Sequence, residues 1–213
     1  MIFPPSSTRP VGELHQNVEA ILHAATAKYS TDVLRAAVMC PPDIYGQGFG
    51  PGKRNTIFFS AYVNKIKNLG LGKAFYVGEG ENRRSWVHIG DLMRVYRGLV
   101  EKAVEGASAD WGKEGYYFAS TQETSQKEIA IATGKILAKH GVLESADPVG
   151  ISTDNLEQVD AMFSEWGIPK LGRYMFASNS RTRADRAKKV LGFEGMEKGI
   201  WEFIEEELVG YGV

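Results

Sequence analysis

Two segments constrain the fold of this chain more than the rest, and both lie between Val38 and Leu92. The first reads MCPPDIYGQGFGPGKR from Met39 and follows an apolar run of strand length. Proline cannot donate a hydrogen bond to a sheet, so Pro41 and Pro42 predict that the strand ends there. The glycines at 46, 48, 50 and 52 predict a flexible loop. The second segment, YVGEGENRRSWVHIGDL from Tyr76, leads into a strongly periodic helix.

Helical spacing and short apolar runs alternate along the chain, which favours an α/β fold. Ser125 and Glu128 form a capping-box pattern at the start of one helix. In the helix at 89–104 we expect five apolar residues to point inward: Leu92, Val95, Tyr96, Leu99 and Val100. We expect helices at 13–28, 55–69, 89–104, 125–140, 154–166, 181–191 and 198–208, and strands at 32–39, 74–77 and 115–119.

Composition excludes several function classes. The chain has 213 residues and a formal net charge of −1, so it lacks the basic footprint of a nucleic-acid or membrane-surface binder. Its only cysteine, Cys40, fits a reducing compartment, and we expect a cytoplasmic protein. No apolar run approaches the roughly 20 residues that span a bilayer. His23, His140 and Cys40 are not at metal-ligand spacing, so no metal site is predicted.

A third segment, SNSRTRADRAKKVLGFEG from Ser178, completes a resemblance that covers nearly the whole chain. The three segments resemble the C-terminal part of an extended or atypical short-chain dehydrogenase/reductase, a fungal-type NAD(P)-binding protein of the NAD-dependent epimerase/dehydratase family. The matching positions in the first two segments are Cys40, Pro42, Tyr45, Gly46, Gly48, Gly78, Gly80, Arg84, Trp86, Val87, His88, Ile89, Asp91 and Leu92.

The resemblance implies a Rossmann-type, doubly wound parallel sheet with a small, mostly helical substrate domain. Residues 1–45 and 74–105 would supply late elements of the Rossmann-type domain, and 46–73 with 106–213 the interleaved substrate domain. NAD or NADP is the implied cofactor. A G-x-G-x-x-G turn that would hold its pyrophosphate does not occur in the sequence. We therefore expect the nucleotide-binding half to be absent and the chain to be truncated, with a natural short form as the alternative.

The family's catalytic pair is Tyr-x-x-x-Lys on the helix before the strand at 32–39, and the sequence does not contain it. Counting back from Glu19 places the two roles at Val11 and His15. Valine has no proton to transfer, whereas histidine titrates near neutral pH. His15 is thus the only catalytic candidate, with a surface histidine as the plain alternative.

The turn after the strand at 32–39 is the predicted cofactor contact, because ligands bind beyond the carboxyl ends of parallel strands. In relatives this turn lies beside the nicotinamide, which implies roles for Pro41, Pro42, Ile44 and Tyr45. The alternative is a turn with a packed tyrosine. His88 and Asp91 fit better as caps of the following helix than as ligands.

Arg84 is the best substrate candidate, since the resemblance gives that position a contact with a substrate phosphate, which a forked guanidinium suits. The alternative is a solvated basic pair with Arg83. Further substrate candidates are Lys53, Arg54 and Asn55 after the glycine loop, or else a flexible charged loop. Asn179 and Arg181 begin a predicted helix whose N-terminus could receive an anion.

Two functions remain open. The first is an NAD(P)-dependent epimerase/dehydratase-like oxidoreductase, or its substrate-binding half, acting on an alcohol, a carbonyl or a sugar-nucleotide-like small molecule. The second is a non-catalytic, cofactor-sensing regulator or a degenerate binding module. The resemblance also implies a homodimer, to which the helix at 13–28 would contribute.

Overall fold

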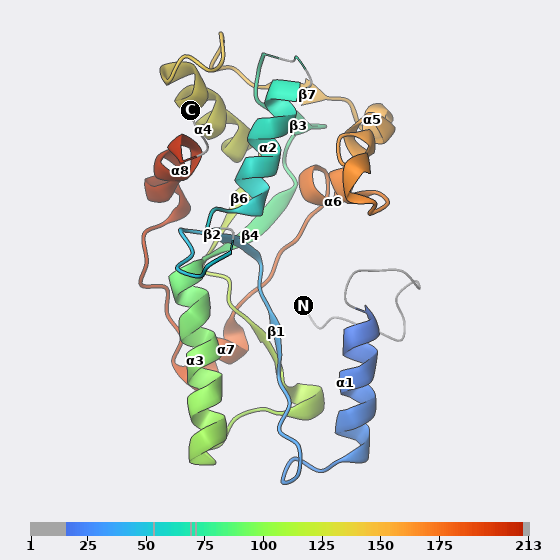
Figure 1. Cartoon of the computed structure of the whole chain (residues 1–213), viewed down its shortest axis with the longest axis vertical. Coiled ribbons are helices and arrows are strands. Elements are labelled where there is room, and N and C mark those ends of the chain that lie inside the picture. Colours follow the sequence, from blue (N-terminus) through green and yellow to red (C-terminus); the bar gives the residue numbers. More distant parts are fainter. Residues whose placement is uncertain (1–15, 53, 69, 71, 211–213) are drawn as a thin grey trace.

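The computed structural model describes residues 16–52, 54–68, 70 and 72–210 as an elongated α/β structure (Figure 1). Helices α1 and α3 lie toward one end of the long axis, and α4 and α5 lie toward the other. The helices are α1 (Gln16–Lys28), α2 (Ile57–Asn68), α3 (Ile89–Glu105), α4 (Gln126–Lys139), α5 (Leu156–Ala161), α6 (Leu171–Phe176), α7 (Asp185–Leu191) and α8 (Ile200–Val209). The strands are β1 (Val38–Cys40), β2 (Asp43–Tyr45), β3 (Phe75–Val77), β4 (Arg83–His88), β5 (Tyr116–Phe118), β6 (Gln122–Ser125) and β7 (Val149–Ile151).

The strands form three small sheets that are mostly parallel. β1 pairs with β5, and β3 pairs with β7, both in parallel. In the third sheet β4 lies between β2, which is parallel to it, and β6, which is antiparallel. Parallel pairs joined by helices are what alternating strand and helix signals predict. The α/β expectation is confirmed.

Two buried clusters hold the structure together, and the β2–β4–β6 sheet separates them. One, which we call the aromatic core, is centred on Phe58, Phe59, Tyr62, Phe75, Trp86 and Phe176. The other, the α3 core, gathers Val87, Leu92, Val95, Leu99, Tyr117 and Ala187. Successive strand residues point to opposite faces, which is why Trp86 belongs to the first cluster and Val87 to the second.

Several expectations about single elements are wrong. The strand expected at 32–39 begins only at Val38, because residues 31–33 form a turn in which Val33 is exposed. The helix expected at 181–191 begins at Asp185. In α3, Leu92, Val95 and Leu99 point inward as expected, but Tyr96 and Val100 are exposed. The cause is that the packed face of α3 is narrow, since one sheet and α7 cover it.

The helix starts at Ser125 and at His88 are as expected. The capping box of α4 is confirmed, with Ser125 Oγ accepting from the Glu128 amide and a Glu128 carboxylate oxygen accepting from the Ser125 amide. The His88 ring caps α3 by accepting from the Gly90 amide at 3.1 Å. Asp91 was also expected to cap α3, but it accepts instead from the Met196 amide at 2.9 Å, outside that helix. Among the described residues, no helix is long and apolar enough to cross a membrane, and no group of histidine, cysteine and acidic side chains could hold a metal ion.

Candidate substrate-binding site

Three segments that are far apart in the sequence meet along β4. β2 pairs with one edge of β4, in the register that puts Asp43 beside Trp86. Residues 179–182 run along β4 as well: the Ser180 amide donates to the Arg83 carbonyl, and the Ser85 amide donates to the Ser180 carbonyl. Asn179 adds a third link, because its Oδ1 accepts from the Arg83 amide at 2.8 Å. The sequence-predicted residues Arg84, Asn179 and Arg181 are thereby brought together.

Arg84 is buried at the centre of this meeting point, with 3% of its surface exposed. Its Nε and Nη2 donate to the two carboxylate oxygens of Asp43, and its Nη1 donates to the Tyr174 carbonyl at 2.8 Å. The guanidinium also lies 5.3 Å from the centroid of the Tyr174 ring. Burial opposes the charged form, but Asp43 outweighs it and raises the pKa of Arg84. The solvated basic pair considered for Arg84 is therefore wrong, and its phosphate role stays a prediction.

The neighbouring arginines, the half-buried Arg83 and the exposed Arg181, share one carboxylate. Arg83 Nε donates to one oxygen of Glu123, and Arg181 Nε donates to the other, each at 2.6 Å. The hydrogen bond from Arg181 is the main cause of the lowered pKa of Glu123, and Arg83 adds to it. Arg83 also approaches Glu128 at 3.8 Å. We call Arg83, Arg84 and Arg181, with Asp43 and Glu123, the arginine cluster.

No helix begins at 179–181, so the anion site that was expected at a helix N-terminus is wrong. The segment is extended because its backbone groups pair with β4. Arg181 instead presents its side chain beside Arg83. Its side chain is 56% exposed, and its hydrogen bond to Glu123 is made by Nε rather than by the two terminal nitrogens. A bound anion could therefore use these nitrogens without breaking a buried contact.

The four predicted cofactor residues differ in how deeply they are buried. Pro42 is buried, Ile44 packs against the α3 core, and only Pro41 is exposed. Tyr45 is 1% exposed, donates to the Lys198 carbonyl at 2.7 Å and accepts from Gln122. Burial raises the pKa of Tyr45 to about 12, so it keeps its proton at neutral pH.

These residues do not fit the pyrophosphate of a dinucleotide. That group needs the amide groups of a glycine-rich turn that opens a helix. After β1 the chain runs through Pro41 and Pro42 directly into β2, and a proline has no N–H to donate. Within this turn the exposed residue that could contact the cofactor is Pro41.

A cavity of about 470 Å³ lies next to Tyr45. Tyr45, Thr121, Phe193 and Glu197 contribute to its lining, with Lys188 as its basic side chain. It opens beside the carboxyl ends of β2 and β5, where ligands bind in parallel sheets. Most of its polar groups already bond within the protein, as Tyr45 does with Lys198 and Gln122.

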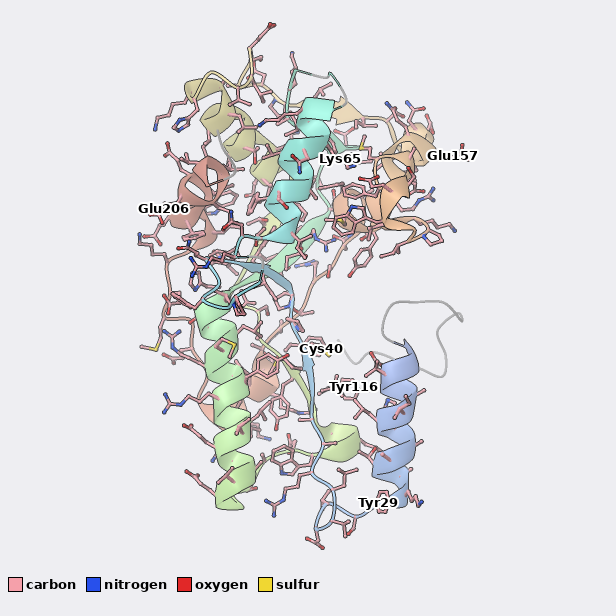
Figure 2. The ribbon with its side chains drawn as sticks, in the orientation of Figure 1. Tyr29, Cys40, Lys65, Tyr116, Glu157 and Glu206 are labelled. Carbon is pink, nitrogen blue, oxygen red and sulfur yellow. The ribbon has the colours of Figure 1, made fainter. Side chains whose placement is uncertain are left out.

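The other candidates lie apart from the arginine cluster or cannot be placed. His15 and Lys53 lie outside the described residues. Arg54 is exposed in the loop, and Asn55 lies beside Gly210 at the end of α8. Figure 2 labels Lys65 on α2, and its ammonium pairs with Glu165.

Sequence reasoning missed Asp43, Glu123 and Tyr174. The signal for Asp43 was available: it lies two residues before Tyr45, and so on the same face of a short strand, where a buried carboxylate needs a cation. Tyr174 comes from α6, and its approach to Arg84 depends on tertiary packing alone.

Residues 4–111 match the NAD dependent epimerase/dehydratase family. The chain belongs to this family. The family's description names NAD as its cofactor. Comparison with curated proteins gives no match.

Solved structures of similar fold include sugar-nucleotide enzymes. The UDP-glucuronic acid 4-epimerase of Bacillus cereus, in complex with UDP-glucuronic acid and NAD, is 14% identical, with a TM-score of 0.55 over 92% of this chain and 51% of that one. The UDP-glucose 4-epimerase of Thermotoga maritima, with UDP-glucose, is 17% identical, with a TM-score of 0.55 over 92% and 51%. The dTDP-glucose 4,6-dehydratase of Bacillus anthracis, in complex with NAD, is 16% identical, with a TM-score of 0.55 over 99% and 55%.

These identities establish a shared fold and nothing finer. The chain spans about half the length of each of these enzymes. The fold expectation, a Rossmann-type epimerase/dehydratase represented in part, agrees with that coverage.

Proposed function

We propose that this chain is the substrate-binding part of an NAD(P)-dependent epimerase/dehydratase-type oxidoreductase, and that it binds the diphosphate of a sugar nucleotide. The arginine cluster is the observation that carries the proposal. Two guanidiniums, the half-buried Arg83 and the exposed Arg181, share the carboxylate of Glu123 next to the buried Arg84. Arginine forks match phosphate oxygens in geometry and charge.

In this proposal the three arginines have different roles. Arg181 contacts the diphosphate directly through its terminal nitrogens, and Arg83 assists from the other side of Glu123. Arg84 is a positioning residue, because its bonds to Asp43 and Tyr174 hold β2, β4 and α6 together beneath the other two.

The hydride chemistry belongs to the cofactor, which would accept or return a hydride at a sugar carbon when bound. Pro41 would lie beside the nicotinamide, and the pyrophosphate would be held by residues other than those described here. Tyr45 is not the acid or base in this proposal, because its hydroxyl is committed to Lys198 and Gln122. His15 stays a prediction for that role, and the division into residues 1–45 with 74–105 and 46–73 with 106–213 also stays one.

A non-catalytic binding module is the second candidate. Two observations favour it: the sequence contains no Tyr-x-x-x-Lys, and the motif tyrosine, Tyr45, is packed with a raised pKa. Such a module would bind a sugar nucleotide or a nicotinamide cofactor without turning either over.

Calorimetric titration of the purified chain with UDP-glucose tests the proposal. We expect saturable binding, and Arg181→Ala should weaken it about tenfold, since it removes one charge-assisted contact with phosphate. Arg183→Ala is the matched control: Arg183 lies two residues further on, is 81% exposed and pairs only with Asp185 among the described residues. It should bind as the wild type does.

A parallel titration with NADH separates the two candidates. Turnover of UDP-glucose with NAD present would support the oxidoreductase and exclude the non-catalytic module, whereas binding of UDP-glucose alone is expected from both. If the folded chain binds no UDP-glucose, or if Arg181→Ala and Arg183→Ala bind alike, the diphosphate site is not at the arginine cluster.

A further inference from the structure

The outer surface of α3 carries a row of exposed apolar side chains. Met93 is 54% exposed, Tyr96 42%, Val100 61% and Val104 83%. Their spacing of three, four and four residues places them on one side of a helix that turns every 3.6 residues. We call these four residues the α3 stripe. A contiguous row of exposed apolar side chains on one side of a helix indicates a surface at which another molecule binds.

The α3 stripe faces away from the rest of the molecule. Leu92, Val95 and Leu99 turn the packed side of α3 toward the sheet. Gly98 faces α7, since a Cβ at Gly98 would lie 3.6 Å from the Leu191 side chain. At about 100° per residue, the stripe lies on the flank opposite Gly98. It therefore continues past the sheet on the side that α7 does not cover, and Figure 1 shows α3 along the outside of that end of the molecule.

The stripe is complementary to itself when reversed. Three pairs of residues are centred on the same point of the helix, because the mean residue number of each pair is 98 to 99. The pairs are Met93 with Val104, Tyr96 with Val100 and Arg97 with Glu101. Two antiparallel α3 helices related by a two-fold axis at that point would bring each member of a pair opposite the other member in the second copy. Isologous contacts of this kind have the same patch on both subunits.

Charge supports the same pairing. Arg97 and Glu101 lie on one flank of the stripe, and they pair with each other within α3 at 2.6 Å. Their side chains are 79% and 50% exposed, so both can reach a neighbouring helix. In the antiparallel arrangement each Arg97 faces Glu101 of the second copy, which gives two ion pairs beside an apolar seam, as at the flanking positions of a coiled coil.

We propose that the α3 stripe is an interface for a second copy of this chain, in a two-fold dimer of antiparallel α3 helices. This surface differs from the helix at 13–28, through which the family resemblance implied a dimer. The proposal does not depend on the proposed function, because none of its residues belongs to the arginine cluster.

Sedimentation velocity of the full chain over a range of concentrations tests the dimer. We expect a reversible monomer–dimer equilibrium that Val100→Asp weakens at least tenfold. Ile21→Asp is the matched control, since Ile21 is 70% exposed on α1 and belongs to the face that the alternative dimer would use. It should leave the equilibrium unchanged. A monomeric wild type, or loss of the dimer in Ile21→Asp and not in Val100→Asp, overturns the proposal.

A charge exchange tests the register. Arg97→Glu alone should dimerise about tenfold more weakly, because it places acidic residues opposite acidic residues, and Glu101→Arg should do the same with basic residues. An equimolar mixture of the two variants should recover dimer, now as a heterodimer. Both substitutions are at exposed positions, so the variants should fold, and circular dichroism checks this. No recovery on mixing would refute the antiparallel pairing, and another segment would then be the occupant of the stripe.

Discussion

The two cores differ in how completely they are enclosed. The aromatic core gathers side chains from α2, α4, α6, α8 and β3, and most of its rings pack edge to face or tilted, as Phe58 does against Trp86 at 5.0 Å. The α3 core is smaller. On one of its sides the only cover is the helix α3, whose outer surface carries the exposed stripe. The aromatic core is packed like the interior of a domain, whereas the α3 core is bounded by a helix with an exposed apolar surface.

Both cores depend on the same two strands, and this explains how the candidate site is held. Asp43, Tyr45, Arg84 and Trp86 lie on one face of the β2–β4 pair, and Ile44 and Val87 lie on the other. The buried ion pair of the site is therefore built into the wall of the enclosed core. Arg83 and Arg181 lie next to this rigid support, which is what a preorganised anion contact requires.

The largest difference between the cores should appear on truncation of a central side chain. Phe176 is fully buried against Phe58, Tyr62, Phe75 and Phe163. Phe176→Ala should lower the free energy of unfolding by about 3–5 kcal/mol. Leu99→Ala should lower it by about 2–3 kcal/mol, since Leu99 is 8% exposed at the rim of the α3 core. Urea denaturation measures both, and equal losses would remove the distinction between the cores.

The next largest loss of stability should follow from breaking the Asp43–Arg84 ion pair, which lies in the sheet between the two cores. Asp43→Ala leaves Arg84 charged and buried, and we expect a loss of about 2–3 kcal/mol. This is below the range for a fully buried pair because the Asp43 side chain is 22% exposed. The double variant Asp43→Leu with Arg84→Met replaces both charges by apolar groups and should recover most of the loss. If the double variant is no more stable than Asp43→Ala, the ion pair is not what stabilises the wall.

Sequence patterns identified the enclosed parts of the molecule better than its open parts. The capping box of α4 and the end of β1 before Pro41 were predictable because the signals are local: a side chain bonds to a backbone three residues away, or a ring lacks an N–H. Tyr96 and Val100 were wrongly predicted to point inward, because periodicity identifies an apolar face but not whether this chain covers it.

The candidate site was predictable only in part, for the same reason. Arg84, Asn179 and Arg181 were chosen from matching segments, and they do meet. That Arg84 is buried and Arg181 is exposed depends on which residues lie opposite, namely Asp43, Tyr174 and Glu123. Those partners are 41, 90 and 58 residues away along the chain. No local pattern contains that information.

The smallest effect separates the helix starts that serve the two cores. Ser125 caps α4, at the aromatic core, through a reciprocal capping box, and Ser125→Ala should cost about 1 kcal/mol. Ser125→Thr keeps a hydroxyl acceptor and should cost less. His88 caps α3, but its ring also packs against Tyr45 at 5.3 Å and Phe203 at 5.7 Å. His88→Ala should therefore cost more than Ser125→Ala, because it removes packing as well as a cap. Equal costs by thermal denaturation would mean that the ring stabilises α3 only as a cap, and that the sheet between the two cores does not depend on it.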